Sequence, residues 1–332
     1  MEKIVPIIKN NRFHHPHILA TWVPESFIWG TLPAFTRSYI KRLFHKKPDV
    51  VQWIEKFQPI TNDPVITWIG HATFLIQING KTILTDPVFG NASFLFRRIL
   101  PPGIPFHALP KIDYVLLSHN HRDHMDGPSL RALKKNNPHL IFLVPHGDKA
   151  WFDRRGLSGA HEFGWWDEYV IPEIRFVFLP AVHWSQRGLF DKNKSLWGSW
   201  MIERVAGGRI YFAGDTAYGI HFSTIAHHFE KIDTVLMPIS PCEPDGWMRR
   251  THVSAEQAVH AFADLKATNF IPMHWGTFPL GSDRFDEPIE RLKRAWHERN
   301  MGDAQLHLAK VGQHIAINGI VSQPVLSGTF QE

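Results

Sequence analysis

Six consecutive residues, His119 to His124, place three imidazoles and one carboxylate within about one turn of backbone. The apolar residues 114–117 precede them and predict a buried strand, while Gly127 and Pro128 follow and open a helical pattern. Such a density of ligand-type side chains on a strand-to-helix loop is typical of a metal site. Histidine makes up 22 of the 332 residues, so a chance cluster is the alternative unless other segments supply further ligands.

Beyond about residue 63, short apolar runs alternate with turn residues and helical patterns. Asn79 and Gly80 separate two such runs and predict a tight β-hairpin, and Ser254 with Gln257 forms a capping box that predicts a helix to about Leu265. The chain has no internal repeat and no linker-like stretch. We therefore predict an α/β layered fold, with one catalytic domain over 61–332 behind an N-terminal extension over 1–60. Strands are expected at 65–69, 73–78, 81–85, 112–117, 140–144, 175–179, 199–203, 209–212, 234–237 and 270–273.

Four of the predicted strands end in side chains that commonly bind metals. They lead to the cluster at 119–124, His183, Asp215 and His274. Loops past strand ends gather at one edge of a layered α/β fold, so we expect these side chains to converge on one site. His71 and Asp86 also end predicted strands and are expected to support the ligands by hydrogen bonds.

Composition narrows the chemistry further. The single cysteine, Cys242, rules out an internal disulfide and a cysteine-rich zinc ribbon, so histidine and carboxylate would have to hold a metal. Residues 1–8 form too short an apolar run for a secretory signal, and the absence of any run of about 18 apolar residues favours a cytoplasmic protein or one peripheral to a membrane. A net charge of +5 favours an anionic partner without choosing among phosphates, anionic lipids and nucleic acids.

The first sixty residues carry nine Lys or Arg against four Asp or Glu. Large apolar residues are interleaved with these charges: Trp22, Phe27, Ile28, Trp29, Leu32 and Phe35. Basic residues attract anionic head groups while aromatic rings sit at the interface, so this segment suits contact with a membrane surface. The same residues suit an arm that packs over the main body, and both interpretations stay open.

The order H-x-H-x-D-H, then a distant histidine, an aspartate and a last histidine, resembles the metallo-β-lactamase superfamily. That resemblance implies an αββα sandwich. It also implies two metal positions, with His119, His121 and His183 at the first, Asp123, His124 and His274 at the second, and Asp215 bridging both. Further strings are similar to the N-acyl-phosphatidylethanolamine-hydrolysing phospholipase D branch, namely 68–73, 84–87, 193–200, 212–216, 243–244, 252–253 and 274–278.

The resemblance implies a phosphodiesterase of phospholipase D type with two Zn²⁺ per chain and a phospholipid substrate. A glutamate in place of His121 would favour the di-iron relatives, so the histidine supports zinc. A water bridging two divalent ions about 3.5–4 Å apart loses its proton near neutral pH and becomes the nucleophile. Asp123 is expected to act as ligand and proton acceptor, and His252 as a donor to a phosphate or leaving oxygen. The alternative for His252 is a backbone hydrogen bond at the start of a helix.

The residues expected near the substrate are less specific than the metal ligands. Thr251 stands where the phospholipase D branch has glutamine, and Cys242 stands where it has an aromatic residue. Trp184 and Trp275 adjoin expected ligands and are predicted to wall the pocket.

Two other functions remain open from the residues alone. The first is another hydrolase on the same scaffold, a lactonase or a nuclease. The abundance of Trp and Phe near the ligands favours an apolar groove over a nucleic-acid track, so no nucleic acid is expected as a partner. The second is a membrane-associating scaffold with structural metals, which the paucity of thiolate ligands disfavours. The oligomeric state, including a homodimer, is left open.

Overall fold

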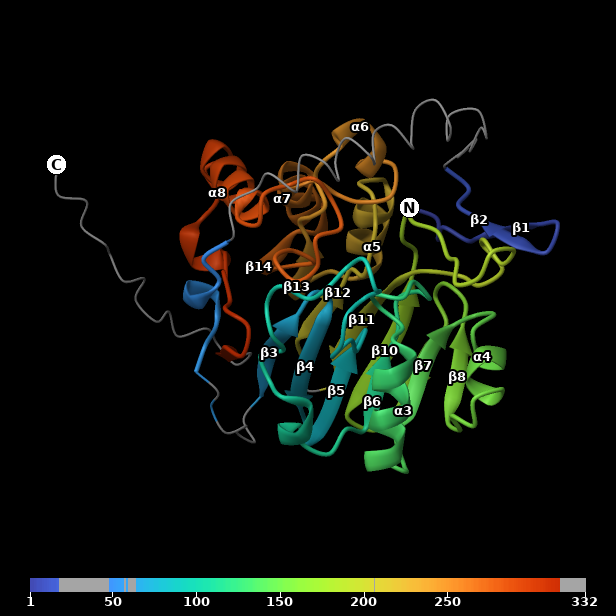
Figure 1. The fold of residues 1–332 in the computed structure, drawn as a ribbon. Coiled ribbons are helices and arrows are strands. Elements are labelled where there is room, and N and C mark those ends of the chain that lie inside the picture. Colours follow the sequence, from blue (N-terminus) through green and yellow to red (C-terminus); the bar gives the residue numbers. More distant parts are fainter. Residues whose placement is uncertain (18–47, 57, 59–63, 206, 317–332) are drawn as a thin grey trace, which may run out of the picture.

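Two mixed β-sheets pack face to face in the computed structural model, which describes residues 1–17, 48–56, 58, 64–205 and 207–316 (Figure 1). The first sheet has the order β15-β3-β4-β5-β6-β7-β8, antiparallel from β15 to β5 and parallel from β5 to β8. Its strands are β3 (Val65–Gly70), β4 (Thr73–Ile78), β5 (Lys81–Thr85), β6 (Tyr114–Leu116), β7 (Ile141–Pro145), β8 (Ala160–Phe163) and β15 (His314–Ala316).

The second sheet has the order β14-β13-β12-β11-β10-β9, antiparallel from β9 to β12 and parallel from β12 to β14. Its strands are β9 (Glu168–Val170), β10 (Ile174–Leu179), β11 (Ser199–Arg204), β12 (Arg209–Phe212), β13 (Ile232–Pro238) and β14 (Ala267–Met273). The inner faces of the two sheets share one apolar core, in which Trp68 and Phe74 of the first sheet belong to the same cluster as Phe178 and Trp200 of the second.

Helices cover the outer faces of both sheets. The helices are α3 (Gly127–Asn136), α4 (Lys149–Asp153), α5 (His221–His228), α6 (Asp245–Met248), α7 (Ala255–Leu265) and α8 (Glu287–Glu298). Leu130 of α3 and Phe152 of α4 pack on the first sheet in a separate apolar cluster, while Phe262 of α7 and Trp296 of α8 pack on the second. The predicted αββα sandwich is confirmed.

Local sequence signals explain several boundaries. Asn79 and Gly80 both have positive φ, 49° and 71°, and join β4 to β5 as the predicted two-residue hairpin. The Ser254 side chain accepts from the Gln257 backbone N–H and the Gln257 side chain accepts from the Ser254 backbone N–H, so the predicted capping box starts α7. Asp126 caps α3 in the same sense, accepting from the Ser129 backbone N–H.

The described part of the N-terminal sixty residues packs on the body. A hairpin of β1 (Ile7–Lys9) and β2 (Arg12–His14) carries Phe13 into the main core, and Trp53 in a 3₁₀ turn (Val51–Trp53) packs against Trp275. The predicted membrane-facing residues Trp22 to Phe35, and the boundary predicted near residue 60, lie outside the described residues. Among the described helices, none has the length and apolar character needed to cross a bilayer.

Candidate metal centre

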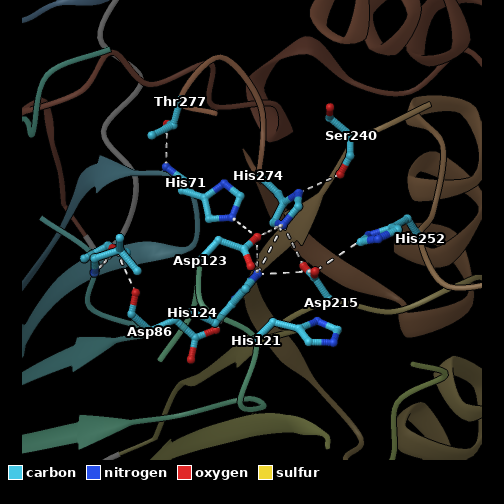
Figure 2. Close-up of polar contacts among 12 residues, drawn as sticks. His71, Asp86, His121, Asp123, His124, Asp215, Ser240, His252, His274 and Thr277 are labelled. Carbon is cyan, nitrogen blue, oxygen red and sulfur yellow. Dashed lines mark hydrogen bonds and ion pairs between the residues drawn. The ribbon is translucent and has the colours of Figure 1, made fainter. Parts of the chain in front are cut away.

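Side chains from the ends of several strands meet at one edge of the sandwich (Figure 2). The loop after β6 supplies the cluster at 119–124, and the segments after β10, β12 and β14 supply His183, Asp215 and His274. His71 and His274 have φ of 55° and 65°, and Asp86 has φ of 34°. Such left-handed backbone is costly for residues other than glycine, and it clusters at functional sites.

Three histidine nitrogens form the first group. His119 Nε2 lies 2.8 Å from His121 Nδ1, and His183 Nε2 lies 3.2 Å from the same atom. All three rings approach one another edge to face, with centroids 4.5 to 5.0 Å apart. Three nitrogens at these separations have the geometry of one metal position.

The second group combines histidine and carboxylate. His124 Nε2 lies 3.2 Å from His274 Nε2 and 3.5 Å from Asp123 Oδ2. His71 joins this group, because its Nε2 lies 3.1 Å from Asp123 Oδ2 and its ring lies 3.9 Å from that of His274. The sequence predicted His71 only as outer support, whereas the structure brings it within ligand range of a metal at this position.

Asp215 lies between the two groups. Its Oδ2 is 3.3 Å from His124 Nε2, 3.8 Å from His183 Nε2 and 3.9 Å from His119 Nε2. Its Oδ1 is 3.0 Å from His274 Nε2 (Figure 2). This is the placement required of a carboxylate that bridges two metal positions.

In three of these histidines, the Nδ1 atom points away from the centre, and its hydrogen bond leaves Nε2 facing the centre. His183 Nδ1 donates to the Thr251 carbonyl and His274 Nδ1 to the Ser240 carbonyl, both at 2.8 Å. His124 Nδ1 donates to Asp86 Oδ2 at 2.6 Å. The Nε2 atom of each neutral ring is then a bare lone pair. His124 Nε2 and His274 Nε2 face each other at 3.2 Å, so a positive charge must lie between them, either a proton on His124 or a metal ion, and the donor set fits a metal.

The electrostatics agree with that fit. Burial, together with the neighbouring imidazoles, holds the pKa of His119 well below its usual value. Burial lowers the pKa of His121 to about 4 and that of His183 to about 3. For Asp215, burial acts to raise the pKa, but His124 and His274 outweigh it and hold the pKa well below the usual range. Neutral imidazole and ionised carboxylate are the states that metal ligation requires.

His124 differs from the other rings. Burial acts to lower its pKa, but the carboxylates of Asp215, Asp123 and Asp86 outweigh burial and raise the pKa well above its usual value. The centre therefore stabilises positive charge at this point, which is where a metal ion would carry it.

Asp86 supports the loop from behind. Its carboxylate accepts from the Ser118 backbone N–H at 2.8 Å, from the Ser118 hydroxyl at 2.5 Å and from His124 Nδ1 at 2.6 Å, and the residue is completely buried. Ser118 Oγ also lies 2.9 Å from His119 Nδ1, so Ser118 is a hydrogen-bonding residue of this loop, the role that its position next to the cluster predicts.

Some of the predicted substrate residues lie at the centre, and the others are buried away from it. Trp184 lies with its ring 4.3 Å from that of His121, and His252 lies with Nδ1 3.7 Å from Asp215 Oδ2. Thr251 contacts the centre through its carbonyl rather than its side chain. Trp275 is not brought to the pocket, because its ring is 1% exposed and packs in the core against Trp68 and Trp53. Cys242 is also buried, with Sγ 3.2 Å from the Ile239 carbonyl oxygen.

Comparison with known proteins places this centre in a family. The model of the beta-lactamase superfamily domain matches residues 81–275, which include all seven predicted ligands. The chain belongs to the metallo-β-lactamase superfamily. It is 31% identical over 307 residues to N-acyl-phosphatidylethanolamine-hydrolyzing phospholipase D 1 of Caenorhabditis elegans, covering 83% of this chain and 86% of the relative.

Two further proteins show how far the similarity extends. The mitochondrial N-acyl-phosphatidylethanolamine-hydrolyzing phospholipase D of Saccharomyces cerevisiae is 34% identical over 240 residues, covering 68% of this chain and 50% of that relative. The structure of Igni18, a metallo hydrolase of Ignicoccus hospitalis, shares the fold with a TM-score of 0.59 at 20% identity, covering 76% of this chain and 97% of that one. The chain is accordingly a metal-dependent hydrolase of this superfamily that resembles the phospholipase D branch.

Proposed function

We propose that the protein is a dinuclear zinc phosphodiesterase that hydrolyses N-acyl-phosphatidylethanolamine or a related phospholipid, releasing phosphatidic acid. The observation that carries the proposal is the position of Asp215, whose Oδ1 lies 3.0 Å from His274 Nε2 of the second group and whose Oδ2 lies 3.8 Å from His183 Nε2 of the first. The similarity to two proteins named as phospholipases D, over 83% and 68% of this chain, supports the substrate class. Imidazole and carboxylate ligands support zinc.

Each side chain has a role in this proposal. The first metal position comprises His119, His121 and His183, the second comprises Asp123, His124 and His274, and Asp215 is shared. When bound, the ions supply an activated water and neutralise charge on the phosphoryl oxygens. Asp123, half-buried beside His71, is placed to accept a proton from the attacking water.

His252 is the proposed donor to a phosphate or leaving oxygen. Among the residues that the structure describes, its buried Nδ1 has no hydrogen-bond partner, so a substrate oxygen could satisfy it. The residue lies two positions before the Ser254 cap of α7, which fixes the backbone that carries it. The alternative predicted from sequence, a His252 side chain that only bonds backbone, finds no support in these contacts.

The surroundings of the centre support a lipid substrate. Two loop tips expose consecutive apolar residues: Phe94 and Leu95 are 85% and 65% exposed, and Leu189 and Phe190 are 86% and 82% exposed. A peripheral contact of these tips with a membrane would present the phospholipid to the metals.

Both tips belong to segments that reach the centre. Arg98, near the first tip, lies over the ring of Phe278 at 5.0 Å, and that ring lies 4.9 Å from His71. Lys192, near the second tip, lies over the ring of Trp184 at 5.4 Å, beside His121. Lys192 is thus a cation that suits an anionic head group, whereas the Arg98 guanidinium donates to the carbonyls of Val88, Gly90 and Leu100 and holds the first tip in place.

Hydrolysis of N-acyl-phosphatidylethanolamine vesicles is the direct test. Zinc-loaded protein is expected to release phosphatidic acid, activity should fall to background after dialysis against a chelator, and Zn²⁺ should restore it. Lactone and soluble phosphodiester substrates are assayed in parallel with the vesicles. Clear turnover of either one with none of the vesicles would overturn the phospholipid assignment and favour a lactonase or nuclease.

His252→Ala is expected to lower kcat on the same vesicles by about 100-fold or more, the usual contribution of a general acid or base. The bound metal should be unchanged, because His252 is outside the proposed ligand set. The matched control is His139→Ala, which removes an exposed imidazole. Equal kcat for the two variants would rule out a proton-donating role, and metal loss in His252→Ala would make the residue a ligand instead.

A further inference from the structure

Residues 118–125, here called the metal loop, carry four of the seven proposed ligands and make contacts on the side away from the metals. Asn120 lies between two ligand histidines and is 4% exposed. Its Nδ2 donates to Asp148 Oδ1 at 3.0 Å. Since Asn120 is anchored on this outer side, His119 and His121 are left to face the centre.

Arg187 holds the same loop from a distant part of the chain. Its Nη1 donates to the carbonyl of Asn120 at 3.0 Å and to the carbonyl of Met125 at 2.7 Å. These two carbonyls bracket residues 121–124, which include three proposed ligands. One guanidinium nitrogen therefore fixes the separation of the two ends of the ligand-bearing turn.

Arg187 is itself held in place. Its guanidinium lies 4.7 Å from the ring of Trp151 in α4, and its backbone N–H donates to Asp191 Oδ1 at 3.1 Å. Burial lowers its pKa to about 10, so the side chain keeps its charge at neutral pH. A charged donor to two backbone carbonyls forms stronger hydrogen bonds than a neutral one.

The loop that presents Arg187 is closed by its own hydrogen bonds. The Asn193 backbone N–H donates to the Ser185 carbonyl at 2.7 Å, and the Gly188 N–H donates to Asp191 at 2.8 Å. Strand β2 then clamps it from outside, since the Phe13 N–H donates to the Asn193 carbonyl at 2.8 Å. The backbone that carries Arg187 is thus fixed by hydrogen bonds within its own loop and by one hydrogen bond from β2.

Asp148, at the start of α4, is the residue that accepts the hydrogen bond from Asn120 of the metal loop. Burial raises its pKa to about 7, although hydrogen bonds from Asn120 and Ser195 act to lower it. An aspartate accepts on Oδ1 in either protonation state, so its bond to Asn120 persists across neutral pH. Gly147 lets this turn approach the Arg187 loop, because a Cβ there would come within 2.6 Å of the Lys194 carbonyl oxygen.

We propose that Arg187 and Asp148 are positioning residues that set the metal affinity of the centre by fixing the backbone of the metal loop. The inference rests on the proposed function, which assigns the ligands, but no proposed role of Arg187 involves contact with metal or substrate. Groups that orient ligands in this way typically change metal affinity by about 10- to 100-fold when they are removed.

The test compares Arg187→Met with Arg155→Met in a chelator competition with Zn²⁺. Arg155 is the matched control, because its guanidinium lies 4.1 Å from the same Trp151 ring but is exposed and, within the described part of the chain, donates only to the Trp151 carbonyl. We expect Arg187→Met to bind zinc about 10- to 100-fold more weakly and Arg155→Met to match the wild type. Arg187→Lys, which keeps the charge on a shorter stem, should recover part of the loss.

A spectroscopic measurement separates positioning from general stability. The absorption bands of the Co²⁺-substituted protein report ligand geometry, and they should change in Arg187→Met but not in Arg155→Met. Wild-type affinity and wild-type bands in Arg187→Met would overturn the inference. If Arg187→Met does not fold, Arg187→Lys carries the test, and wild-type affinity in that variant overturns it. A wild-type chain that binds no Zn²⁺ would instead refute the proposed function itself.

Discussion

Replacing both His121 and Asp215 with alanine is expected to leave the protein without bound metal and to lower hydrolysis by more than about 1000-fold. His121 Nδ1 is the atom that approaches both other nitrogens of the first group, at 2.8 and 3.2 Å. Asp215 is the carboxylate that lies between the groups, 3.0 Å from His274 of the second and 3.8 Å from His183 of the first. The double substitution therefore removes one ligand of the first metal position, His121, and the ligand that both positions share, Asp215.

Elemental analysis of the purified variant, together with the vesicle assay, measures this expectation. The single variants distinguish the two positions, because His121→Ala should reduce metal at the first and Asp215→Ala should weaken both. His139→Ala again serves as the histidine control, and circular dichroism establishes that each variant is folded. Full activity of the double variant would eliminate the dinuclear mechanism.

Asp86→Ala is expected to destabilise the metal-free protein by about 3–5 kcal/mol and to lower its metal content as well. The change leaves the Ser118 backbone N–H, the Ser118 hydroxyl and His124 Nδ1 without their shared acceptor in a fully buried site. Buried donors without partners carry their full desolvation cost. Urea denaturation of the metal-free variant against the metal-free wild type isolates the stability effect from the loss of metal.

Asp153→Ala is the matched control for Asp86→Ala. Asp153 pairs with Lys149 at 2.6 Å, but the two side chains are 54% and 47% exposed. Exposed pairs of this kind contribute less than about 1 kcal/mol, so the urea midpoint should hardly move. A similar small effect for Asp86→Ala would show that the carboxylate does not hold the loop.

The fold was predictable from sequence wherever a segment is strongly apolar and bounded by turn residues. Each of the ten predicted strands overlaps a strand of the structure, and β12 was predicted with its observed bounds, Arg209–Phe212. The strands that were not predicted are short or polar, as in β9 (Glu168–Val170) and β15 (His314–Ala316). Such strands exist because of the neighbours with which they pair, and local sequence carries little of that information.

The residues of the candidate site were also predictable where they follow a strongly apolar strand, and not elsewhere. His119 to His124, His183, Asp215 and His274 follow apolar strands, and the structure brings all of them together, while their roles as ligands stay predictions. Trp275 was expected at the pocket from its position beside His274, but the chain leaves β14 at Met273 with a left-handed φ of 65° at His274, and the Trp275 ring lies in the core against Trp68. Arg187 had no local signal, since it lies 67 and 62 residues from the two carbonyls that it binds.

The left-handed backbone of His71, Asp86 and His274 has a consequence for how such a chain evolves or is engineered. Each conformation costs roughly 1–3 kcal/mol for a residue with a side chain, and glycine would relieve it. Random mutagenesis screened only for heat resistance would thus tend to collect glycine at His71 and His274 and discard catalysis on the way, whereas at Asp86 the loss of a buried acceptor outweighs the relief of strain. Screens for a more robust variant should hold them fixed and seek their gains in the apolar layers far from this edge.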